Sequence, residues 1–178
     1  GPMLSSDIAG DDFAELSANM FEQLFEPTTL TYDESISELE VLTKGTVKAE
    51  IIGGNLSLLT NSIGTKFEIE TSGKILLIED IGEEPYRVDG MLNQLRQANK
   101  LNNLAGVVIG DFADAQSTGS KTSFTVDEVF NDYFKSATYP VMKGFKIGHC
   151  QPHFAIPLGV EAQLDTTNKV LRLAPGVE

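Results

Sequence analysis

The sequence contains no tryptophan, a single cysteine and few basic residues, and these shortages exclude several classes of protein. Cys150 has no second cysteine to pair with, so nothing in the sequence indicates an oxidising compartment. Thirteen Lys and Arg residues against 26 Asp and Glu residues give a net charge of −13. Because that charge repels nucleic-acid phosphates and anionic lipid surfaces, neither is expected as a partner.

Long apolar runs are also missing. The longest, at 75–78 and 105–109, fall far below the roughly 18 residues that cross a bilayer. Hydrophobic residues nevertheless make up 41% of the 178 residues, which suffices for a core. We therefore expect one ordinary domain plus a connecting segment.

Apolar periodicity predicts an α/β fold, in which a mixed β-sheet is flanked by helices. Residues 28–44 are polar and acidic, which favours a linker or a peripheral hairpin. The predicted helices are 5–26, 85–100 and 124–134, and the predicted strands are 46–52, 74–80, 104–110, 141–147, 154–164 and 170–173.

Glu79 and Asp80 end the most apolar predicted strand. Functional groups of open α/β sheets gather at the carboxyl ends of strands, where partial burial tunes the charge of an acid. The structural alternative is that Glu79 caps the following turn or pairs with Arg87.

His149 lies in the segment 148–153, which holds both histidines of the chain. A histidine beside a buried carboxylate acts as a general base, because the acid fixes its tautomer. A structural histidine is one alternative. A zinc site of His149, Cys150 and His153 is another, although Pro152 opposes a helix that would place both histidines on one face.

No nucleophile is evident in the sequence. It contains no G-x-S-x-G elbow, and Ser57 lies between two leucines, which favours a structural role. Cys150 adjoins His149, but neighbours along a strand point to opposite faces.

Several blocks, in order, resemble the LD-carboxypeptidases of the peptidase S66 family and the related microcin C immunity peptidases. The Gly-Gly-Asn-Leu segment at 53–56 and Gly64-Thr65 resemble one family block. The further blocks are Ile75 to Asp80, Glu84 to Asp89 with Met91-Leu92, Gly106 to Phe112, Pro140-Val141, Gly144-Phe145, Gly148-His149 and Ile156 to Gly159.

The resemblance implies a Ser–Glu–His triad with Glu79 as the acid and His149 as the base, 70 residues apart. The serine would belong to a preceding N-terminal domain that this chain lacks. Residues 1–44 would be the helical linker from that domain, and 45–178 the C-terminal, swivelling-type catalytic half. Gly1-Pro2-Met3 resembles a family segment near the end of the N-terminal domain, which favours a native origin over a tag remnant.

The activity implied by the resemblance is removal of the terminal D-alanine from muropeptide stem peptides during cell-wall recycling, in the cytoplasm. No metal or organic cofactor is implied. The implied partners are the peptide substrate, the protein's own N-terminal domain and a second copy in a homodimer. The alternatives are an immunity peptidase acting on a peptidyl-nucleotide, and a non-catalytic binding module of the same fold.

One position departs from the family pattern. The chain has Gly90 where family helices usually carry Arg, so a role of that basic residue does not transfer. Gly90 also destabilises its predicted helix by about 1 kcal/mol relative to Ala.

Overall fold

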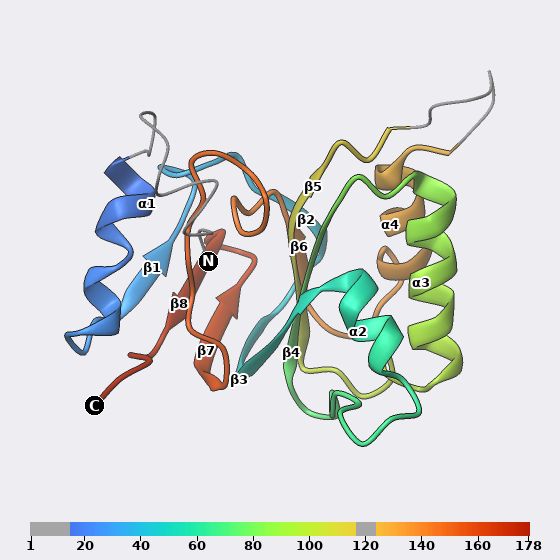
Figure 1. Cartoon of the computed structure of the whole chain (residues 1–178), viewed down its shortest axis with the longest axis horizontal. Coiled ribbons are helices and arrows are strands. Elements are labelled where there is room, and N and C mark those ends of the chain that lie inside the picture. Colours follow the sequence, from blue (N-terminus) through green and yellow to red (C-terminus); the bar gives the residue numbers. More distant parts are fainter. Residues whose placement is uncertain (1–14, 117–123) are drawn as a thin grey trace.

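The computed structural model describes residues 15–116 and 124–178, which form one eight-stranded mixed sheet with flanking helices (Figure 1). The strand order is β1-β8-β7-β3-β4-β5-β6-β2, and it confirms the predicted fold class. The strands are β1 (Leu30–Tyr32), β2 (Glu40–Thr43), β3 (Thr46–Asn55), β4 (Ile75–Ile81), β5 (Gly106–Ala113), β6 (Val141–Lys143), β7 (Val160–Asp165) and β8 (Val170–Leu173). The helices are α1 (Glu15–Asn19), α2 (Leu56–Ser62), α3 (Pro85–Gln97) and α4 (Val126–Phe134), with a 3-10 turn at Glu22–Leu24.

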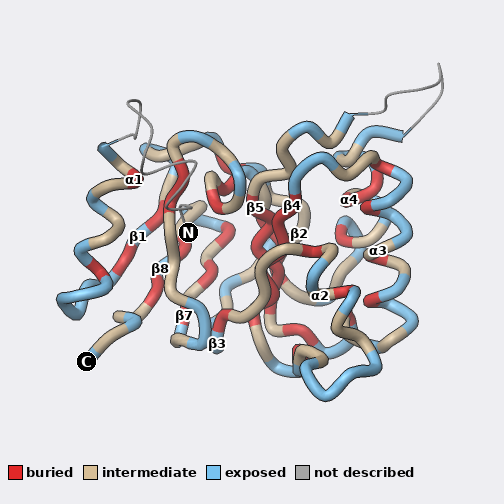
Figure 2. Tube along the Cα trace, in the orientation of Figure 1, coloured by how far each residue is buried: buried red, intermediate tan, exposed pale blue. Residues whose placement is uncertain are grey.

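Strands β3 to β6 run parallel and form the half of the sheet that carries α2, α3 and α4. Leu76, Ile78 and Val107 project from this half into a core shared with the three helices. Because a parallel sheet is buried on both faces, β4 contains consecutive apolar residues, and buried positions follow β4 and β5 in Figure 2. The predicted helices at 85–100 and 124–134 are confirmed as α3 and α4.

The antiparallel strands β1, β8 and β7 extend the sheet from β3, and a second core covers its other face. The Tyr32 ring lies 4.9 Å from the rings of Phe145 and Phe154, measured between centroids. Its hydroxyl accepts a hydrogen bond of 2.7 Å from the Lys146 amide. These contacts fix the loop that follows β6 against the sheet.

The prediction of a linker or peripheral hairpin at 28–44 is wrong. Strand β1 pairs with β8 and strand β2 pairs with β6, so this segment supplies both edges of the sheet. The sequence does not reveal β1 because the strand has only three residues, too few for its alternation of buried and exposed positions to be recognised. The origin of residues 1–44 in a separate domain stays a prediction.

Three predicted elements are shorter in the structure. The strands expected at 141–147 and 154–164 are limited to β6 and β7, because Gly144, Gly148 and Gly159 have positive φ angles that interrupt an extended chain. Of the helix expected at 5–26, residues 5–14 lie outside the described residues, and α1 and the 3-10 turn cover parts of the rest. No helix within 15–116 or 124–178 is long and apolar enough to span a membrane.

Gly53 and Gly90 offer a matched test of packing. Gly53 has a φ of +125°, and a Cβ there would lie 2.0 Å from the Leu77 carbonyl oxygen, whereas a Cβ on Gly90 would have no atom within 4 Å. We expect Gly53→Ala to lower the free energy of unfolding by about 3 kcal/mol. Gly90→Ala should raise it by about 1 kcal/mol, because alanine favours a helix. Urea unfolding of both variants measures this, and equal effects would contradict the packing of β3 on β4.

Candidate active site

Two adjacent carboxylates near the carboxyl end of β4 project to opposite faces of the sheet. Glu79 lies on the side of the loop that follows β6, and its side chain is only 10% exposed. Asp80 lies on the helical side and is also buried. Because side chains alternate along a β-strand, these two adjacent acids lie in different environments.

Glu79 contacts His149, the residue with which the family resemblance paired it. Glu79 Oε2 lies 2.8 Å from His149 Nδ1, and the His149 side chain is 32% exposed. A carboxylate on Nδ1 holds the proton there and leaves Nε2 as the nitrogen that exchanges protons. Glu79 and His149 both line a cavity of about 420 Å³, so a ligand in that cavity can reach the imidazole.

Two glycines permit this contact. A Cβ on Gly148 would lie 2.8 Å from Glu79 Oε2, and one on Gly110 would lie 2.2 Å from the Ile147 carbonyl oxygen. The Asp111 amide also donates a 2.8 Å hydrogen bond to that carbonyl, which ties the loop to β5. The Gly-His pair therefore has a geometric reason, because a side chain at 148 would separate the histidine from its carboxylate.

Asp80 is structural. It accepts hydrogen bonds of 2.8 Å from the Asn55 side-chain amide and from the Ser57 backbone amide. The Asn55 side chain caps α2 through the Leu58 amide and accepts a hydrogen bond from the Ser57 hydroxyl. Ser57 thus has the structural place that the sequence indicated.

The other residues of segment 148–153 do not form a metal site. Within 15–116 and 124–178, no group of three or more His, Cys, Asp or Glu side chains is placed to hold a metal ion. His153 is buried, and its backbone exchanges two 3.1 Å hydrogen bonds with the Ser17 hydroxyl. Burial, with the nearby Asp111 carboxylate adding to it, raises the pKa of the Cys150 thiol to about 11.

Asp111, near the end of β5, lies beside the Glu79–His149 pair and was not predicted as a site residue from the sequence. A Cβ on Gly148 would lie 3.4 Å from its Cβ, and burial raises the pKa of its carboxyl. Asp111 also lines a second and larger cavity, of about 790 Å³. The signal that could have found it is the one that found Glu79, an acid at the end of a buried apolar strand.

The LD-carboxypeptidase C-terminal domain model matches residues 48–164. The chain is 46% identical over 177 residues to a Bacillus subtilis (strain 168) protein named "Probable murein peptide carboxypeptidase", covering 99% of this chain and 56% of the relative. It is 29% identical over 126 residues to the microcin C7 self-immunity protein MccF of Escherichia coli, covering 70% of this chain and 36% of that protein.

A solved structure agrees with these relatives. The muramoyltetrapeptide carboxypeptidase from Oxalobacter formigenes superposes with a TM-score of 0.84 at 28% identity, over 99% of this chain and 60% of the other. The chain thus spans little more than half the length of these two carboxypeptidases. The match of the family model, the sequence identity and the shared fold together show that this chain belongs to the LD-carboxypeptidase family, peptidase family S66.

Proposed function

We propose that this chain supplies the acid and the base of a serine carboxypeptidase whose nucleophile lies in another domain of the full-length protein. The observation that carries the proposal is the 2.8 Å contact between Glu79 and His149 at a cavity. Glu79 would be the ionised acid that orients the imidazole, and His149 would be the general base.

The proposed reaction has two halves. In the first, His149 Nε2 takes the proton of the serine hydroxyl as its oxygen attacks the carbonyl carbon of the last peptide bond. The imidazolium, stabilised by Glu79, returns that proton to the leaving amine, and an acyl-enzyme ester remains. In the second half, His149 takes a proton from water, the hydroxide opens the ester, and the serine recovers its proton.

The proposed substrate is a muropeptide stem that ends in D-alanine. The names of the two carboxypeptidase relatives support this substrate class. The smaller cavity has an apolar wall that includes Leu77, Ile147 and Ile156, and its described lining contains no Lys or Arg. A carboxypeptidase must recognise the terminal carboxylate of its substrate. Because this cavity offers no cation, the group that binds the carboxylate would belong to the domain that supplies the serine.

An immunity peptidase that cleaves a peptidyl-nucleotide is the second candidate, and the similarity to MccF favours it. It would use the same Glu79 and His149, so comparing turnover of the two substrate classes separates the candidates. A non-catalytic module would turn over neither. A homodimer and a cytoplasmic location stay predictions from the family resemblance.

The acid and base roles are tested by Glu79→Gln and His149→Ala in the full-length protein. We expect kcat for D-alanine release from a tetrapeptide stem to fall by about 10²–10⁴-fold in each, because the members of a triad act as a unit. The control is Glu161→Gln, which makes the same change on the exposed face of β7. Variants that match the unaltered enzyme would refute the assignment.

The two-domain site predicts that the isolated chain is inactive. Without the serine, acid and base have no nucleophile to activate, so D-alanine release should stay at the buffer rate. Circular dichroism confirms that the chain tested is folded, and the full-length protein is the positive control. Hydrolysis by the pure chain that Glu79→Gln abolishes would show that the nucleophile lies within the chain.

Cys150 lines the same cavity as His149 and is an alternative nucleophile, but its pKa argues against that role. A thiol pKa of about 11 instead of 9.0 lowers the thiolate fraction at neutral pH by about 100-fold. We expect an aromatic disulfide reagent at pH 8 to modify the folded chain about 100-fold more slowly than the chain in urea. Equal rates would restore Cys150 as a candidate.

A further inference from the structure

A short loop carries His149, and its two ends lie side by side. The Phe154 amide donates a 2.6 Å hydrogen bond to the Lys146 carbonyl and so closes residues 147–153, which we call the histidine loop. The Lys146 amide in turn donates a 2.7 Å hydrogen bond to the Tyr32 hydroxyl, which fixes the side where the loop begins. The place of the imidazole therefore also depends on what holds the side where the loop ends.

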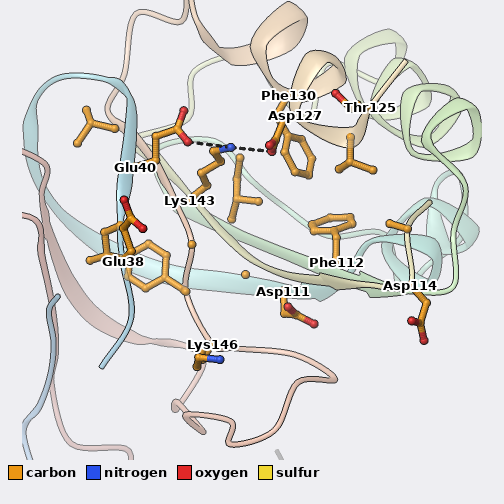
Figure 3. Close-up of a pocket in the computed structure, with 18 of the residues that line it drawn as sticks. Glu38, Glu40, Asp111, Phe112, Asp114, Thr125, Asp127, Phe130, Lys143 and Lys146 are labelled. Carbon is orange, nitrogen blue, oxygen red and sulfur yellow. Dashed lines mark hydrogen bonds and ion pairs between the residues drawn. The ribbon is translucent and has the colours of Figure 1, made fainter. Parts of the chain in front are cut away.

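Ion pairs at the neighbouring larger cavity do not supply that support. Lys143 binds Glu40 at 3.0 Å and Asp127 at 2.6 Å, but it belongs to β6 and precedes the loop (Figure 3). Lys146 and Asp111 lie nearer to the loop, and no ion pair links either of them to another described side chain. Support for the end of the loop therefore comes from another part of the fold.

Ser17, in α1, holds the end of the histidine loop. Its hydroxyl donates a 3.1 Å hydrogen bond to the His153 carbonyl and accepts one of 3.1 Å from the His153 amide. One hydroxyl thus binds both backbone groups of a residue that is 136 positions away in the sequence. Because Ser17 and His153 are both buried, loss of the hydroxyl would remove a hydrogen bond from two backbone groups that water does not reach.

Gln23 makes a second contact, two residues further along the chain from His153. Its side-chain amide donates hydrogen bonds of 3.0 Å to the Ala155 carbonyl and 2.6 Å to the Met20 carbonyl. Ala155 lines the cavity at His149, and it also lines a separate cavity of about 260 Å³ to which Gln23 contributes. Residues 15–24 are therefore bound to the wall of the cavity in which His149 lies.

We infer that Ser17 is a positioning residue for His149, because it holds the histidine loop where the imidazole Nδ1 meets Glu79. Gln23 supports the same arrangement through the Ala155 carbonyl. The inference deepens the proposed function and rests on it for its effect on the reaction. Under that function, residues 1–44 lead from the domain of the serine, so the segment that connects to the nucleophile also places the base.

The test compares Ser17→Ala with Thr71→Val, which removes a different buried hydroxyl. Thr71 donates a 2.7 Å hydrogen bond to the Lys100 carbonyl, and it precedes β4 at the end of the strand remote from Glu79. Each variant loses one buried hydroxyl that binds a distant backbone carbonyl. Only Ser17→Ala should alter the histidine loop.

NMR of the purified chain, with isotope-labelled histidine, follows the imidazole of His149 directly. The chain has two histidines, so His149→Ala identifies the signal of the Nδ1 proton that lies on Glu79. We expect this proton to exchange with water about 10-fold faster in Ser17→Ala, because the loop opens more readily without its contact to α1. Thr71→Val should leave the exchange rate unchanged.

Kinetics of the full-length protein separate positioning from substrate binding. Ser17→Ala should lower kcat for D-alanine release by about 10-fold and change KM by less than about 2-fold, because a displaced base slows the reaction more than it weakens binding. Gln23→Met keeps the length of the side chain but removes its amide. It should change proton exchange and kcat in the same directions, and it provides the test where Ser17→Ala does not fold.

An unchanged exchange rate in Ser17→Ala, or the same acceleration in Thr71→Val, would overturn the inference. The exchange measurement needs no nucleophile, so its result is separate from the reaction. If exchange responds as expected but Glu79→Gln and His149→Ala leave the full-length protein fully active, the proposed function alone is overturned.

Discussion

The close approach of the loop after β6 to the ends of β4 and β5 is the constraint on which the site depends. Where the loop crosses the strands, a side chain at position 110 or 148 would clash with the facing segment. Because glycine stands at both positions, the loop approaches closely enough for His149 Nδ1 to lie 2.8 Å from Glu79 Oε2. Tyr32 fixes the loop on its other side, because its hydroxyl accepts a hydrogen bond from the Lys146 backbone amide. Strand β1, which looked peripheral in the sequence, therefore helps to position the imidazole through the second core.

Because side chains alternate along β4, its two adjacent acids lie on opposite faces of the sheet and have different partners. Glu79 faces the loop and the cavity, whereas Asp80, one residue later, binds Asn55 and the amide of Ser57 at the start of α2. A one-residue change of register would exchange these positions, so that Asp80 would face the loop and Asn55 and the Ser57 amide would lose their carboxylate partner. Pairing of β4 with both β3 and β5 fixes that register, so the sheet determines which carboxylate contacts His149.

Sequence reasoning recovered the parts of the molecule that are encoded locally. A run of apolar residues identified β4. The pairing of Glu79 with His149 came from the family resemblance; the two side chains lie 2.8 Å apart in the structure, and their catalytic roles stay a prediction. Sequence reasoning failed for residues 28–44 because two strands of three and four residues are stabilised by distant partners, not by their own pattern. It missed Asp111 for a related reason. Whether an acid at a strand end is paired depends on which groups the fold brings beside it, and Lys146 is 35 residues away along the chain.

Charge explains why single basic residues matter so much in this chain. A protein with a net charge of −13 repels a peptide that carries several carboxylates, so each anionic group of such a substrate needs a nearby cation. Lys143 is neutralised by two acids, and the described lining of the cavity at Glu79 and His149 contains neither Lys nor Arg. Lys146, in the loop that follows β6, has no ion-pair partner among the described residues. On this face of the sheet, Lys146 is therefore the cation that the fold leaves uncompensated, next to the segment that carries His149.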